Sequence, residues 1–149
     1  PRKEAAEIIE NYFTQFGNIK KYMDDTIEFA KENGYVETIM GRRRYIRDIN
    51  SGNATVRGFA ERNAINAPIQ GSAADMIKLA MINIQKWLRL SSYKTKMILQ
   101  VHDELLFDVP RSEIAEVQPK IIELMSKAIK LDVPVLVEAS HGENWLEAH

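Results

Sequence analysis

The 149-residue chain contains no cysteine, which excludes disulfide bonds and thiolate metal sites. Its apolar runs are all shorter than the roughly 20 residues of a membrane span, and its first residues do not resemble a signal peptide. It has no glycine-rich phosphate loop and no nucleophile-elbow motif, so neither a P-loop NTPase nor a Ser-His-Asp hydrolase is indicated. Its histidines lack the spacing of a zinc site. We therefore expect a soluble, cytoplasmic protein.

The formal net charge is −1, but the charges are unevenly distributed along the chain. Residues 41–62 contain six arginines against Asp48 and Glu61, a local net charge of +4. Residues 102–149 contain four lysines or arginines against ten acidic residues, a local net charge of −6. A basic stretch and an acidic one in the same chain are suited to holding a polyanion close to a cation.

Apolar residues recur at helical spacing in three parts of the chain. The predicted helices cover 4–32, from about 56 to 90, and 112–130. The first is broken near Gly17, and the second is interrupted at Pro68, which should kink or split it. Its second part, 71–90, shows the clearest apolar stripe, and Ser72 with Asp75 would cap its start.

Strands are predicted in hairpins over 33–46 and 96–109, and in a third stretch over 133–139. Gly41 would supply the turn of the first hairpin. In the second, apolar residues alternate so that one set can face a single core: Met97, Leu99, Val101, Leu105, Phe107 and Val109. The fold class is therefore α+β, mainly helical with a small antiparallel sheet.

The stretch MILQVHDELLFDVP places His102, Asp103 and Glu104 at the tip of the second hairpin, between two apolar strands. One interpretation is a solvated turn, since aspartate favours turns by bonding nearby backbone N–H groups. The other is a metal site, because carboxylates on rigid strand ends are oxygen ligands of the kind Mg²⁺ prefers. The triplet alone leaves both interpretations open.

Arg62, Asn66 and Gln70 follow one another at four-residue spacing and would share a helix face if Pro68 does not disturb it. Such side chains hydrogen-bond phosphates, sugars and base edges, although a solvated helix face has the same composition. The arginine-rich stretch GRRRYIRD just upstream makes a phosphate-binding surface plausible.

Four stretches follow one another as in the C-terminal end of bacterial family A DNA polymerases, and the resemblance covers essentially the whole chain. They are GYVETIMGRRRYI, AERNAINAPIQGSAADMIKLAM, MILQVHDELLFDVP and VPVLVEASHGENWLEAH. The His-Asp-Glu triplet also resembles the DNA polymerases rather than the related single-subunit RNA polymerases, whose corresponding stretch lacks that glutamate.

The resemblance implies a role for each candidate residue. Asp103 matches the palm aspartate that binds the catalytic divalent metals, Glu104 its supporting carboxylate, and His102 a residue close to the primer terminus. Three helix residues match those that contact the primer–template duplex, chiefly through its minor groove: Arg62, Asn66 and Gln70. The implied reaction is transfer of a nucleotide from dNTP to a primer 3′-hydroxyl with two Mg²⁺ ions, in DNA replication and repair at the bacterial nucleoid.

The resemblance also assigns residues 1–50 to the end of the fingers and 51–149 to the C-terminal part of the palm of a right-hand polymerase. The family's other metal aspartate and its nucleotide-binding fingers helix lie upstream of the matching region. We therefore expect a larger parent enzyme that synthesises DNA, and an inactive isolated fragment with its Mg²⁺ site unoccupied. That fragment should also self-associate through surfaces that normally pack on the upstream palm.

Two other functions stay open at this stage. A non-catalytic nucleic-acid-binding module would use the basic stretch and the Arg62 face, and its DNA binding would depend on salt but not on metal. A metal-dependent hydrolase would centre on Asp103 and Glu104, but two carboxylates are few for unaided phosphoester hydrolysis.

Overall fold

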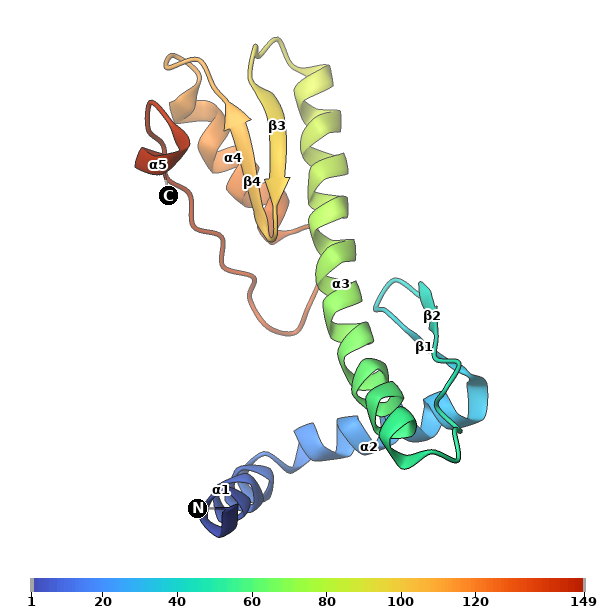
Figure 1. Ribbon diagram of the computed structural model, residues 1–149. Helices are drawn as coiled ribbons and strands as arrows, with labels where there is room; N and C mark the ends of the chain where they lie inside the picture. The colour runs from blue at the N-terminus through green and yellow to red at the C-terminus, as the bar shows by residue number, and fades with distance from the viewer. Residues whose placement is uncertain (1, 149) are drawn as a thin grey trace. The chain divides into compact units, whose positions relative to one another are not determined.

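The computed structural model describes the backbone of residues 2–148 and the side chains of residues 3–148. The elements are α1 (Arg2–Gln15), α2 (Gly17–Asn33), β1 (Tyr35–Glu37), β2 (Arg43–Tyr45), α3 (Ala54–Leu90), β3 (Lys96–Val101), β4 (Glu104–Asp108), α4 (Ile114–Ser126) and α5 (Trp145–Ala148). They form two compact units, one up to Ser72 and one from Ala73, and α3 contributes to both (Figure 1). The predicted class, mainly helical with small antiparallel sheets, is confirmed. In the part of the chain that the structure describes, none of the helices combines the length and apolar character of a bilayer span.

The first unit contains the predicted helix pair and hairpin. Gly34 ends α2 in the left-handed conformation, with φ of 77°, and its N–H donates to the carbonyl of Ala30. β1 and β2 then pair antiparallel, with Val36 opposite Arg44. Gly41, at φ of 74°, lies in the connecting turn as predicted, because a positive φ costs glycine little.

The start of α3 is set by a side-chain cap. Asn53 Oδ1 accepts hydrogen bonds from the N–H groups of Thr55 (2.9 Å) and Val56 (3.3 Å), so the helix begins two residues earlier than predicted. Small apolar side chains on one face of this part of α3 then pack on α2 and the hairpin. The buried cluster consists of Ala30, Val36, Ile46, Ile49, Ala60, Ala64 and Ala67.

Of the two effects predicted for Pro68, a kink or a split, the split is wrong, because α3 continues through Pro68 as one helix. An internal proline removes one helix hydrogen bond and costs about 3 kcal/mol in an isolated helix. Ala64 (0% exposed) and Ala67 (6%), in the turn just before Pro68, are buried, so packing holds the helix together across the missing bond. The prediction that Ser72 and Asp75 cap the start of a helix over 71–90 is consequently wrong as well. Ser72 lies inside α3, where its Oγ accepts a hydrogen bond from the N–H of Ile39 at 2.9 Å, and Asp75 is buried in the helix interior.

In the second unit, the antiparallel β3–β4 hairpin packs on α4 and on the later turns of α3. The core consists of Ile84, Leu88, Val117 and Ile121, with partly buried neighbours that include Trp87, Tyr93, Leu105 and Phe107. The chain connects β3 to β4 by the two residues His102 and Asp103 (Figure 1).

Strict alternation along β3 is not observed. Met97 pairs with Phe107 but Leu99 pairs with Leu106, so the register shifts at Ile98. A bulge of this kind rotates the following residues to the other face, which explains why Leu99 remains 46% exposed.

The third predicted strand is wrong, since residues 133–139 form no strand in the structure. Valine-rich composition favours strands, but a strand also needs a hydrogen-bonded neighbour, and no ladder to this stretch is formed within the described residues. A side-chain contact is made instead, from Gln118 Nε2 to the carbonyl of Ala139 at 3.0 Å.

Candidate metal centre and nucleic-acid interface

The tip of the β3–β4 hairpin presents three ionisable side chains to solvent. His102, Asp103 and Glu104 are all exposed, while Val101 and Leu105 on either side are partly buried. Val101 pairs with Glu104 across the hairpin, so the turn contains only two residues. We call residues 102–104 the acidic corner.

His102 adopts an unusual backbone conformation. Its φ of 53° makes it the one non-glycine residue with positive φ among residues 2–148. A positive φ at the first central position and a negative φ at the second is the sign pattern of a type II′ turn, in which glycine usually takes the first position. Gln100 Nε2 supports the turn by donating to the carbonyl of His102 at 2.9 Å. Strained residues of this kind often mark functional sites.

The carboxylates of the acidic corner are only part of a metal site. Mg²⁺ requires six oxygen ligands in near-octahedral geometry. Across the part of the chain that is described, no group of three or more His, Cys, Asp or Glu side chains is placed to hold a metal. Asp103 and Glu104 have the right hard-oxygen chemistry and exposure, but a complete site needs ligands from another segment or from a bound phosphate.

The second candidate surface lies on α3. Arg62, Asn66 and Gln70 are all exposed and, because the helix continues through Pro68, they remain on one face at four-residue spacing. The opposite side of these turns carries buried alanines of the first unit's core. The predicted alignment is therefore present. The acidic corner lies in the other compact unit.

Part of the arginine-rich stretch has internal partners. Arg43 Nε lies 2.8 Å from Glu37 Oε1, and its guanidinium lies 4.4 Å from the centre of the Tyr35 ring. The hydrogen bond to Glu37 raises the pKa of Arg43 further above its ordinary value. Arg42 Nη2 donates to the carbonyl of Gly71 at 3.1 Å. These two arginines hold the hairpin together and onto α3, although both are exposed to solvent, as Arg44 is.

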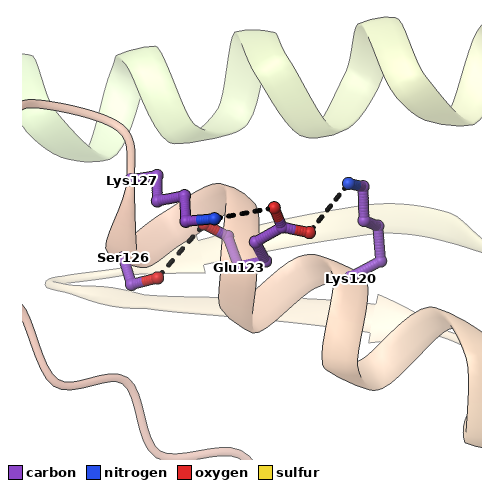
Figure 2. Close-up of polar contacts among 4 residues, drawn as sticks. All are labelled: Lys120, Glu123, Ser126 and Lys127. Carbon is purple, nitrogen blue, oxygen red and sulfur yellow. Dashed lines mark hydrogen bonds and ion pairs between the residues drawn. The ribbon is translucent and has the colours of Figure 1, made fainter.

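The sequence analysis missed two sets of interactions. Glu113 accepts hydrogen bonds from Thr95 and Lys94, which lie 18 and 19 positions earlier and lead into β3. Local sequence patterns do not predict such a contact. Glu123 lies between Lys120 and Lys127 on α4 (Figure 2). Their spacings of three and four residues are a readable signal for ion pairs on a helix.

Comparisons with known proteins agree on one family. The family model described as DNA polymerase family A matches residues 1–147. DNA polymerase I of Streptococcus pneumoniae is 51% identical over 147 residues, which are 99% of this chain and 17% of that protein. DNA polymerase I of Caldicellulosiruptor bescii is 50% identical over 146 residues, 98% of this chain and 17% of that protein. The chain thus spans about a sixth of the length of these curated relatives.

A solved structure is similar over nearly the whole chain. It is described as the POL domain of Pol1 from M. smegmatis in complex with DNA primer-template and dNTP. The similarity has a TM-score of 0.96 at 44% sequence identity, and it covers 99% of this chain and 26% of the other.

Proposed function

The chain belongs to DNA polymerase family A, and from this premise we propose that it forms part of the site at which a DNA-directed DNA polymerase adds a nucleotide to a primer. The observation that carries the proposal is the acidic corner: two exposed carboxylates, Asp103 on a two-residue turn and Glu104 at the start of β4, anchored by a hairpin that packs on a core. The similar polymerase domain was solved with primer-template and dNTP, which are the partners we propose for the enzyme containing this chain.

Asp103 is proposed as a metal ligand, with Glu104 in a supporting role. Bound Mg²⁺ ions would supply the positive charge that favours phosphoryl transfer, and Asp103 with Glu104 would hold them on this side of the site. The chain's own contribution is to fix the carboxylates in place, because displacing a reacting group by about an ångström can cost a factor of 100 in rate. The remaining carboxylate ligand would come from a segment outside these residues, as the family resemblance implies.

Arg62, Asn66 and Gln70 are proposed to contact the primer–template duplex, and His102 to lie near the primer terminus. An arginine followed by two amides can bind phosphates, sugars and the acceptor atoms of the minor groove. The exposure of all three on one helix face supports this assignment.

The same proposal assigns residues 1–50 to the fingers and 51–149 to the palm, in an enzyme of replication and repair in the bacterial cytoplasm. The isolated 149-residue chain is proposed to be inactive, because one turn with two carboxylates cannot bind two metal ions and a triphosphate.

Exposed apolar side chains in the second unit suggest that the isolated chain self-associates. Leu90 is 80%, Ile82 61% and Ile98 57% exposed. Ile82 and Leu90 line a groove together with Met81 and Met97. Contiguous apolar surface of this kind normally marks a contact region, and in the isolated chain a second copy is its proposed occupant.

Primer extension by the polymerase that contains this sequence tests the proposal, with Asp103→Asn as the variant. We expect nucleotide incorporation to fall at least about 100-fold while affinity for primer–template DNA changes little, since the substitution is nearly isosteric and removes ligand charge. Asp108→Asn is the matched control, because Asp108 is exposed at the opposite end of the same hairpin. Unchanged incorporation by Asp103→Asn, or equal losses in both variants, would contradict the proposal. Strong DNA binding without metal-dependent incorporation by the unmodified enzyme would favour a non-catalytic binding module.

A further inference from the structure

Glu113, just ahead of α4, accepts several hydrogen bonds from the segment that leads into β3. Its Oε1 lies 2.9 Å from the backbone nitrogen of Lys94. Its Oε2 lies 3.0 Å from the backbone nitrogen of Thr95 and 2.7 Å from Thr95 Oγ1. Thr95 is only 5% exposed. A single carboxylate therefore satisfies the donors of two consecutive residues immediately before the strand begins.

Both sides of this contact are held in place. The N–H of Glu113 donates to the carbonyl of Pro110 at 2.8 Å, and its carbonyl accepts the N–H of Val117 at 2.9 Å. On the strand side, the hydroxyl of Tyr93 donates to Glu116 Oε2 at 2.5 Å. The hydrogen bonds from Lys94 and then Thr95 keep the pKa of Glu113 below its usual range, so it is ionised when it accepts them.

The contact lies at the end of the hairpin opposite the acidic corner. β3 begins at Lys96, one residue after Thr95, and Lys96 pairs with Asp108 at the end of β4. The same ladder ends at Val101 and Glu104, where the corner begins. The position of Thr95 therefore determines where the pairing between β3 and β4 begins.

The register of the β3–β4 ladder depends on contacts made outside the ladder. A two-stranded hairpin is marginally stable by itself, and the bulge between Met97 and Leu99 already displaces the pairing by one residue. A further slip by one residue would turn each following side chain to the opposite face.

We propose that Glu113 is a positioning residue for the acidic corner: by binding Lys94 and Thr95 it fixes the register of β3 and thereby the place of Asp103 and Glu104. For its effect on catalysis, the inference rests on the proposed function. Its effect on the strand register is independent of that function. Glu113 touches no reacting group and acts through the strand.

The first test is backbone amide hydrogen exchange in the 149-residue chain, with Glu113→Ala and Glu113→Gln. We expect Glu113→Ala to speed exchange along β3 as far as Val101, by about tenfold or more, because opening of the hairpin controls these amides. Glu113→Gln, which keeps an acceptor oxygen, should give a smaller change. Glu116→Ala is the control: it removes the partner of Tyr93 and leaves the Thr95 contacts. Acceleration confined to Lys94 and Thr95, or equal acceleration by the control, would overturn the inference.

The second test is single-turnover nucleotide incorporation in the polymerase that contains this sequence. Glu113→Ala should lower the rate about tenfold with little change in the dissociation constant for primer–template DNA, and Glu113→Gln should recover part of it. A parallel loss of rate and DNA affinity, or an unchanged rate, would overturn the positioning role. If Glu113→Ala does not fold, the same comparison is made with Glu113→Gln. If Asp103→Asn is slow and Glu113→Ala is unaffected, only the positioning role of Glu113 is refuted. If Asp103→Asn is unaffected, the proposed function is refuted, and hydrogen exchange alone then tests whether Glu113 fixes the register of β3.

Discussion

Thr38 lies directly against Gly71. A Cβ atom added to Gly71 would lie 2.5 Å from Thr38 Cγ2, which is closer than non-bonded carbon atoms approach one another in proteins. The turn between β1 and β2 thus lies against α3 at a position where no side chain fits. Two hydrogen bonds secure it there, from Ile39 N–H to Ser72 Oγ and from Arg42 to the carbonyl of Gly71. Gly71 therefore allows the arginine-bearing hairpin to pack closely against α3.

We predict that Gly71→Ala lowers the free energy of unfolding of the chain by about 1–3 kcal/mol, because the added methyl group overpacks a tight contact. Gly58→Ala is the matched control in the same helix. Its Cβ would meet only Arg62 Nη1, at 3.8 Å, and better helix propensity should stabilise the chain by about 1 kcal/mol. Thr38→Ser, which removes Cγ2 and keeps the hydroxyl that accepts the N–H of Arg42, should rescue Gly71→Ala. Denaturant unfolding measures all of these, and equal effects of the two alanines would contradict the packing argument.

Glu123 should remain ionised in strong acid. Hydrogen bonds from Lys120 and then Lys127 lower its pKa from 4.5 to about 2 (Figure 2). Because the folded-state pKa lies below the unfolded one, its contribution to stability is present above about pH 4.5 and is lost as the pH falls towards 2. NMR titration of the side-chain carboxyl carbon should find Glu123 still charged at about pH 3.

The two lysines make this prediction specific. Lys120→Met removes the larger cause and should raise the pKa of Glu123, whereas Lys130→Met should not, because Lys130 is not among the partners of that carboxylate. Added salt should weaken the effect, since the ion pairs are at the surface. A Glu123 that titrates at its ordinary value in the unmodified chain would contradict the arrangement.

The α3 face should show two kinds of contact with DNA. In the polymerase that contains this sequence, Arg62→Ala should weaken duplex binding and reduce the slope of log affinity against log salt by about 0.9, because one cation no longer displaces counterions. Asn66→Ala or Gln70→Ala should leave the salt slope unchanged, because these side chains are neutral, and should lower affinity or incorporation. Lys78→Ala, an exposed cation elsewhere on α3, is the control. Three variants indistinguishable from the control would exclude this face from the interface.

The isolated chain should form oligomers as its concentration rises. Light scattering should show an increasing mass, and replacing Ile82 and Leu90 together with lysine should reduce it, because both exposed side chains line the apolar groove of the second unit, whereas Leu146 does not. Leu146→Lys is the control, since Leu146 is 88% exposed on the short helix α5. A single monomeric mass at high concentration would contradict the prediction.

The sequence correctly predicted the turns and strands that depend mainly on the residues within them. Gly41 marked the hairpin turn, and the apolar strands around His102 and Asp103 indicated the exposed corner. These features depend on backbone conformations and periodicities that can be read from a few neighbouring residues.

Errors arose where distant packing decides the outcome. Pro68 resembles a helix breaker, yet buried alanines hold α3 continuous, and residues 133–139 have strand composition but no strand to pair with. The contacts of Glu113 with Thr95 and of Gly71 with Thr38 join residues far apart in sequence. No periodicity reveals such pairs, so the residues that position the candidate site could be found only in three dimensions.

Metal rescue of an Asp103→Cys variant tests the central claim, that Asp103 ligates the catalytic cation, most directly. The 149-residue chain contains no native cysteine, so the new thiolate would be its only thiolate ligand. The assay is single-turnover primer extension by the polymerase that contains this sequence. We predict that Asp103→Cys severely loses nucleotide incorporation with Mg²⁺ and partly recovers it with a thiophilic cation such as Cd²⁺. The recovery should exceed any effect of the same cation on Asp103→Asn. Equal loss in both variants with every cation, or full activity with Mg²⁺, would contradict metal ligation by Asp103.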